Sequence, residues 1–113
     1  MSRSMRILVV CGAGASSAFV AHRIRHTGEA RGLELTVHAG SESDLPGSLD
    51  PIDVLLVGPY LAPRYEKIRA EAIKRGVGVA LLPDTVFASQ NGDEALNLAI
   101  YAFKSRGWAE LRA

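Results

Sequence analysis

A short run of aliphatic residues near the start constrains the fold of this chain more than any other feature. Residues 5–10 read Met-Arg-Ile-Leu-Val-Val and stop at the glycine-rich segment Cys11-Gly-Ala-Gly-Ala-Ser-Ser. Continuous apolar runs of this length are typical of strands that are buried on both faces. A helical pattern follows at once, with Ser16 or Ser17 as the expected N-cap and Gly32 as the expected C-cap. The segment therefore predicts a buried strand, a tight turn and a helix.

The alternation of strand and helix continues along the rest of the chain. Further elements are expected as a half-buried or edge strand at 33–39, a loop at 40–51, a buried strand at 52–57, a helix at 61–75 that stops at Gly76, a strand at 77–82, and a helix that is initiated at 91–93 and ends near Gly107. Such alternation indicates an α/β fold, in which a mostly parallel sheet is covered by helices on both faces and joined by right-handed crossovers.

Composition excludes several classes of protein. The chain has 113 residues, of which 48% are hydrophobic and 22% are charged, and this balance predicts one folded domain rather than a disordered segment. No apolar run approaches the roughly 18 residues of a membrane span, and the N-terminus has no signal-peptide core. A formal net charge of +1 argues against a nucleic-acid partner. With a single cysteine, the chain is expected in the reducing cytoplasm.

Cys11 falls where parallel α/β sheets bind their ligands. Ligands of such sheets lie beyond the carboxyl ends of the strands, where the turns after the first, third and fourth strands would meet. Gly12 and Gly14 leave backbone N–H groups able to converge at a helix N-terminus, which can bind a phosphoryl-sized anion and favours a thiolate. Ser16 and Ser17 would add hydroxyl donors. The alternative is that Cys11 is only a small buried residue at a strand end.

The loop lacks residues that several classes of phosphate-binding protein need. It has no lysine for a Walker motif, and Ser17 stands where a dinucleotide fingerprint needs its third glycine, so no cofactor is expected. A cysteine phosphatase would have an arginine six residues after the cysteine, and that position is also Ser17. A phosphoryl group on Cys11 would then persist, which is typical of a carrier. A phosphatase-like hydrolase and a non-catalytic anion-binding module stay open as alternatives.

Three segments resemble one known family. The loop Cys11-Gly-Ala-Gly-Ala-Ser-Ser-Ala resembles the cysteine loop C-[SG]-x-G-[MA]-[ST]-[ST] of the cytoplasmic B component (IIB) of enzyme II of the bacterial sugar phosphotransferase system (PTS), of the lactose/cellobiose/diacetylchitobiose type. Asp53-Val-Leu-Leu-Val-Gly-Pro is similar to the third strand and Gly-Pro turn of that family, and Asp84 follows the fourth strand. Gly12 and Ala15 depart from its commonest residues, and the galactitol and ascorbate IIB types have similar loops.

The resemblance implies a fold and a relay. The chain would form a single IIB domain over residues 1–113, with its core at about 5–104. Its four-stranded parallel sheet would have the order 2-1-3-4, and the fold would be Rossmann-like or cysteine-phosphatase-like. Cys11 would take a phosphoryl group from a phosphohistidine of a IIA protein. It would pass the group to a sugar, such as cellobiose, chitobiose or lactose, bound by the membrane component IIC, so that the protein lies in the cytoplasm at the membrane.

The resemblance also implies a set of site residues around Cys11. The phosphate-binding loop would consist of Gly12, Ala13, Gly14, Ala15, Ser16, Ser17 and Ala18. The rim of the site would be formed by Gly58, Pro59, Tyr60 and Asp84.

The first helix has two further polar groups. His22 and His26 stand four residues apart, a spacing that can bind zinc, but no third ligand is evident and no metal is expected. Arg23, Arg25 and Arg31 are expected to form a solvated basic face, or to steer a phosphorylated partner onto the Cys11 loop. The apolar side of this helix should contain Phe19, Val20 and Ile24.

Overall fold

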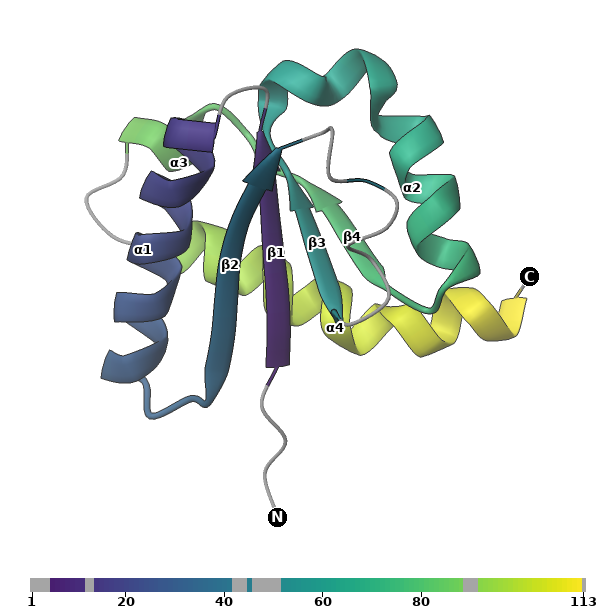
Figure 1. Ribbon diagram of the computed structural model, residues 1–113. Helices are drawn as coiled ribbons and strands as arrows, with labels where there is room; N and C mark the ends of the chain where they lie inside the picture. Colours follow the sequence, from purple (N-terminus) through teal and green to yellow (C-terminus); the bar gives the residue numbers. More distant parts are fainter. Residues whose placement is uncertain (1–4, 12–13, 42–44, 46–51, 89–91, 113) are drawn as a thin grey trace.

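A parallel sheet with helices on both faces forms the framework of the protein (Figure 1). The computed structural model describes residues 5–11, 14–41, 45, 52–88 and 92–112. Its elements are β1 (Met5–Cys11), α1 (Gly14–Ala30), β2 (Leu35–Ser41), β3 (Val54–Val57), the 3-10 helix η3 (Pro59–Arg64), α2 (Tyr65–Lys74), β4 (Gly78–Leu81), α3 (Thr85–Ala88) and α4 (Asp93–Arg112). All pairings in the sheet are parallel, in the order β2-β1-β3-β4. The predicted α/β fold and strand order are confirmed.

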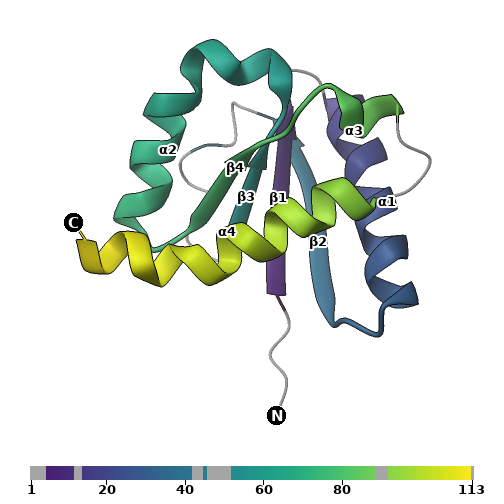
Figure 2. The same cartoon turned by 180° about the vertical axis from the view of Figure 1, so that it is seen from behind.

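The pleat of the central strands divides the core between two helical layers. In β1, Ile7 and Val9 pack in one cluster with residues of α1 and α4, whereas Leu8 and Val10 pack in a second cluster with residues of η3 and α2. The side chains of β3 alternate between the two clusters in the same way. Figure 2 shows α4 crossing the face of the sheet that belongs to the first cluster. Burial on both faces explains why these strands are apolar throughout.

A buried carboxylate joins the start of β1 to the residue before β3. Asp53 is buried, and its Oδ2 accepts hydrogen bonds from the backbone N–H of Arg6 at 3.0 Å and from its Nε at 3.3 Å. Arg6 Nη2 donates to the other carboxylate oxygen at 3.3 Å. The backbone N–H of Asp53 donates in return to the carbonyl of Arg6 at 2.8 Å. These bonds fix the register in which Ile7 lies opposite Val54.

The segment after β3 differs from the single helix expected at 61–75. It begins as the 3-10 helix η3 with Pro59 in its first turn, contains Pro63, and becomes the α-helix α2 only at Tyr65. Proline has no N–H to donate within a helix and its ring crowds the preceding turn, so Pro63 disfavours a continuous α-helix here. Leu61 is nevertheless buried, as its spacing predicted.

The ends of the other elements follow the predictions in part. Gly32 and Gly76 have positive φ angles of 73° and 71°, and they end α1 and the turn after α2 as expected. The prediction that a helix ends near Gly107 is wrong, because α4 continues to Arg112. Glycine is tolerated inside a helix at a cost of about 1 kcal/mol relative to alanine, so it stops a helix only where the backbone turns. Strand β2 begins at Leu35 instead of residue 33.

Two further observations concern the helices. The short helix α3 was not expected, since a single turn leaves no periodic pattern in a sequence. Among the described residues, no helix has both the length and the apolar character that crossing a membrane requires.

Candidate functional site

Cys11 is the last residue of β1 and lies at the carboxyl edge of the sheet. It pairs in register with Ser41 of β2, and the residue before it, Val10, pairs with Val57 of β3. The Cys11 side chain is fully buried and belongs to the core cluster shared with α1 and α4. Helix α1 begins only three residues later, at Gly14. The thiol therefore stands between a strand end and a helix start, as the sequence predicted.

Gly58 closes against the thiol from the neighbouring strand. Its backbone N–H donates to the carbonyl of Val10 at 2.7 Å, which holds the residue beside the end of β1. A Cβ atom on Gly58 would lie 2.7 Å from Cys11 Sγ and 3.2 Å from Cys11 Cα. The backbone of Gly58 is extended, with a φ of −66°, so this position needs glycine for space and not for conformation. Any larger residue would displace the thiol.

The start of α1 differs from the expected cap. The helix begins at Gly14, so that Ser16 and Ser17 lie inside its first turns and neither is the N-cap. The predicted phosphate-binding residues 14–18 thus all belong to α1, while Gly12 and Ala13 lie outside the described residues. The first N–H groups of a helix have no partner within it and carry a partial positive charge. Such groups suit an anion next to Cys11.

Ser17 has a partner that the sequence did not reveal. Its side chain is fully buried, and its hydroxyl donates a hydrogen bond to the backbone carbonyl of Gly40 in β2 at 3.0 Å. The sequence pattern predicts that this hydroxyl points at a bound anion. In the structure it connects α1 to β2.

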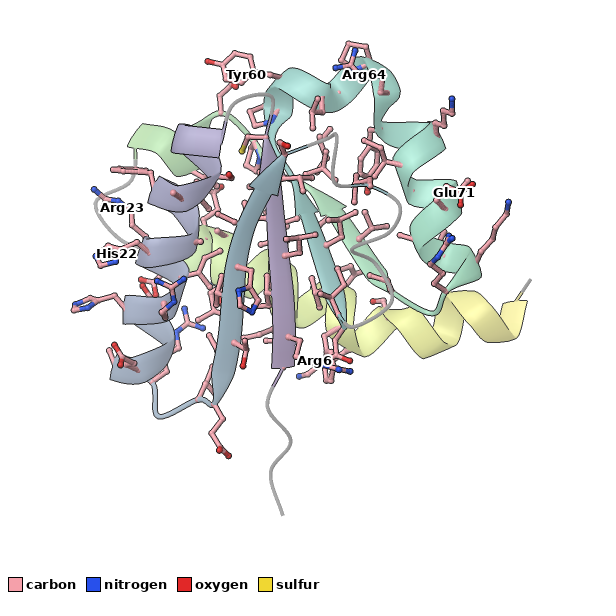
Figure 3. All side chains as sticks on the ribbon, viewed as in Figure 1. Arg6, His22, Arg23, Tyr60, Arg64 and Glu71 are labelled. Atoms are coloured by element: carbon pink, nitrogen blue, oxygen red, sulfur yellow. The ribbon has the colours of Figure 1, made fainter. Side chains whose placement is uncertain are left out.

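The predicted rim residues extend from the same edge. Pro59 opens η3 directly after Gly58, and Tyr60 is 74% exposed and projects outward from this edge in Figure 3. Asp84 is exposed and lies in the turn between β4 and α3. Gly58, which was predicted as part of the rim, packs against Cys11.

The outer face of α1 carries an aromatic and cationic cluster. The guanidinium of Arg23 lies 4.3 Å from the centre of the Phe19 ring, which suits a cation–π contact. Phe19, which the helical spacing places on one side with Val20 and Ile24, is 43% exposed, whereas Val20 and Ile24 are buried. His22 and His26 stack with ring centres 6.4 Å apart. Figure 3 shows His22 and Arg23 pointing away from the sheet.

Arg25 and Arg31 of the expected basic face bind neighbouring elements. Arg25 donates to the carbonyl of Val37 at 2.7 Å, and Arg31 contacts Asp93 at 2.7 Å and Asn97 at 2.9 Å on α4. Arg25 and Arg31 thus hold α1 against its neighbours.

Among the described residues, no three His, Cys, Asp or Glu side chains come together in a way that could hold a metal ion.

Two residues of α2 have shifted pKa values. The pKa of Glu71 is lowered, because Arg75 donates a hydrogen bond of 2.8 Å to its carboxylate and Lys74 adds a favourable charge. The pKa of Tyr65 is raised by partial burial of its phenol. Both residues belong to the packing and surface charge of this helix.

Comparison with known families agrees with this geometry. Residues 6–97 match the model of the family described as "PTS system, Lactose/Cellobiose specific IIB subunit". The lactose-specific EIICB component of the PTS from Streptococcus mutans is 28% identical to this chain over 80 residues. That match covers 71% of this chain but only 14% of the relative, so the chain spans a small part of the relative's length.

Two solved structures share the fold. The lactose-specific IIB domain of the phosphoenolpyruvate:carbohydrate PTS from Streptococcus pneumoniae superposes with a TM-score of 0.80 at 14% identity, covering 89% of this chain and 99% of that domain. The cellobiose-specific phosphotransferase IIB component from Borrelia burgdorferi superposes with a TM-score of 0.74 at 29% identity, covering 92% and 95% of the two chains. Since the family match extends over most of its length, the chain belongs to the lactose/cellobiose-specific IIB subunit family of the sugar phosphotransferase system.

Proposed function

We propose that Cys11 carries a phosphoryl group between two partners of a sugar phosphotransferase system. The thiolate sulfur would attack phosphorus on a phosphohistidine of IIA, forming the S–P bond as the N–P bond breaks. A hydroxyl oxygen of a sugar held by IIC would then attack the same phosphorus, forming an O–P bond as the S–P bond breaks. The hydroxyl proton would pass to water, and Cys11 would return to the thiolate. The observation that carries the proposal is the position of Cys11 at the end of β1, three residues before α1 begins.

The start of α1 supplies what such a transfer needs from the protein. The transferring phosphoryl group requires alignment with the attacking sulfur and positive charge near its three outer oxygens, and it requires little acid–base chemistry. Helix N–H groups near the sulfur meet both needs. The Cys11 side chain is fully buried when the chain is without a partner. Transfer would therefore also require the phosphohistidine of IIA to displace the groups that cover the sulfur.

Position 17 favours a carrier over a hydrolase. A cysteine phosphatase places an arginine at this point of the loop to hold the phosphoryl oxygens in a bidentate grip. Here the residue is Ser17, which is buried and bonded to the carbonyl of Gly40. Without that arginine, water has little help in cleaving the S–P bond, and the phosphocysteine should persist long enough to meet a second partner.

The names of the relatives indicate partners and substrate. The relative from Streptococcus mutans is an EIICB component, which has C and B components in one chain, and this supports IIC as the acceptor-side partner. A IIA protein is the donor that the family implies. The relatives are described as specific for lactose or cellobiose, so a disaccharide of this class is the proposed sugar. The protein would act at the cytoplasmic side of the membrane.

Transfer from a labelled donor tests this proposal. The full chain is incubated with purified IIA that carries [32P]phosphohistidine, and label on the chain is measured over time. Wild-type protein should gain about one phosphoryl group that survives removal of IIA, whereas Cys11→Ser should gain none. Label on Cys11→Ser, or inorganic phosphate released at the rate of transfer, would contradict the proposal and favour respectively another acceptor or a hydrolase.

A further inference from the structure

The Ser17 side chain is fully buried, and its hydroxyl is bonded to the backbone of β2. We infer that Ser17 is a positioning residue, whose hydrogen bond to β2 fixes the direction of the α1 N-terminus relative to Cys11. This inference rests on the proposed role of Cys11 as the phosphoryl carrier. It assigns to Ser17 a role different from the phosphate ligand that the sequence suggested.

The hydrogen bond connects two places that both adjoin the thiol. Ser17 lies in the first turns of α1, and its hydroxyl donates to the carbonyl of Gly40 at 3.0 Å. Gly40 lies opposite Val10 in the sheet, and the next pair in the register is Cys11 with Ser41. The bond therefore ties the start of the helix to the strand directly beside the end of β1.

The covalent chain alone does not set this direction. Two residues separate Cys11 from the first residue of α1, so the helix start must stay near the sulfur. Packing of Val20, Ala21 and Ile24 in the core holds the helix farther along. The bond from Ser17 to β2 holds the start of the helix. Farther along the helix, Arg25 makes a similar bond to the carbonyl of Val37 at 2.7 Å, but from an exposed position two turns away from Ser17.

The direction of the helix start matters because the N–H groups act over short distances. Donors stabilise the charge of a transferring group only when they are held close to the positions of its oxygens, and a misplacement of about 1 Å can cost about a hundredfold in rate. A hydroxyl has one proton, and that of Ser17 is directed at Gly40. Ser17 thus acts on the phosphoryl group through α1.

Thr27 offers a matched control for the test. It is a second buried hydroxyl of α1, and its Oγ1 accepts a hydrogen bond from the backbone N–H of Gly92 at 2.9 Å. Like Ser17, it joins α1 to another part of the fold, but it lies ten residues farther along the helix. Loss of either hydroxyl should destabilise the protein, but only the loss at position 17 should slow phosphoryl transfer to Cys11.

The experiment measures the single labelling of the full chain by phosphorylated IIA, which is present in excess and varied in concentration. Here kcat denotes the maximal rate constant of labelling, and KM denotes the IIA concentration that gives half of it. We expect Ser17→Ala to lower kcat by about tenfold or more at an unchanged KM, because a buried residue does not meet the partner. Ser17→Thr keeps the hydroxyl and should stay within about threefold of wild type. Thr27→Val should lower the unfolding temperature to a similar extent as Ser17→Ala and leave kcat unchanged.

Several outcomes would overturn the inference. A wild-type kcat in Ser17→Ala, a kcat loss of equal size in Thr27→Val, or a rise in KM without a loss of kcat would each contradict it. If Ser17→Ala does not fold, Ser17→Thr decides: a folded variant near the wild-type kcat supports the role, and one slowed more than about tenfold opposes it. Label on Cys11→Ser would instead overturn the proposed function itself.

Discussion

Gly58 and Cys11 are in direct contact across the end of the sheet, so that a Cβ atom on Gly58 would stand 2.7 Å from the Cys11 sulfur. Gly58 cannot yield easily, because its N–H is bonded to the carbonyl of Val10 at 2.7 Å. The end of β3 is thus tightly packed against the end of β1 at these two residues. The size of residue 58 controls where the sulfur can lie.

Replacement of Gly58 by alanine should therefore impair phosphoryl transfer. The added methyl group would push the sulfur from its place between strand and helix, and we expect the rate of labelling from phosphorylated IIA to fall by about tenfold or more. Gly32→Ala is the control. Its φ of +73° disfavours alanine by about 1 kcal/mol, yet nothing lies within 4 Å of an added Cβ. Equal transfer rates in Gly58→Ala and Gly32→Ala would contradict this reading of the contact.

Asp53→Asn should destabilise the fold without a direct effect on the thiol. The variant removes the charge that accepts hydrogen bonds from the backbone N–H and the guanidinium of Arg6. Since Asp53 is buried, we expect a loss of about 2 kcal/mol in the free energy of unfolding, measured by urea denaturation. Glu66→Gln removes an exposed pair with Arg69 at 3.7 Å and should cost no more than about 0.5 kcal/mol. Similar losses in both variants would show that burial is not what gives the Arg6 pair its strength.

The raised pKa of Tyr65 predicts a loss of stability at alkaline pH. Burial of the phenol raises its pKa above 10.0, with Arg69 opposing and Glu66 adding to the shift. The folded protein therefore holds this proton more tightly than the unfolded chain, so the contribution of Tyr65 to stability is constant below pH 10 and falls as the pH rises past it. Unfolding measured at pH 8 and at pH 10.5 should show a larger drop for wild type than for Tyr65→Phe, which has no such proton. Identical drops would mean that the phenol ionises alike in both states.

Tyr60 and Tyr101 form a natural pair for testing the surface around the thiol. Their side chains are 74% and 72% exposed, but Tyr60 lies at the edge that holds Cys11 and Tyr101 lies on α4. If partners approach at this edge, Tyr60→Ala should raise the KM for phosphorylated IIA by about fivefold or more, as truncation of an aromatic contact does. Tyr101→Ala should leave it unchanged. An unchanged KM in Tyr60→Ala would exclude Tyr60 from the surface that meets IIA.

The position of the thiol can be predicted from the sequence because it depends only on local patterns of residues. Continuous apolar residues predict a doubly buried strand, glycines predict the turn, and the next period predicts a helix, so Cys11 had to stand at their junction. Local patterns predict the ends of helices less accurately. Neither the glycine inside α4 nor the 3-10 geometry around Pro63 can be assigned from periodicity, because packing determines whether a helix continues past an unfavourable residue.

Phe19 shows a different limit. Its spacing fits the buried side of α1, yet the ring is 43% exposed and lies under the guanidinium of Arg23. The residue lies at the border of the apolar face, where a helical pattern alone does not separate a core position from a surface one. A neighbouring cation one turn away is a signal for such a contact, since residues four apart on a helix meet.

The residue pattern is enough to predict the order of the strands and the longer helices, the two-sided burial of the central strands and the place of Cys11 between strand and helix. It does not predict that Gly58 packs on the sulfur, that Asp53 binds Arg6, or that the Ser17 hydroxyl reaches Gly40, which are seen in the folded structure. Each of these pairs joins residues that are distant in the chain. Periodicity records which face a residue occupies, whereas its partner depends on the register and crossing of whole elements, which many residues set together.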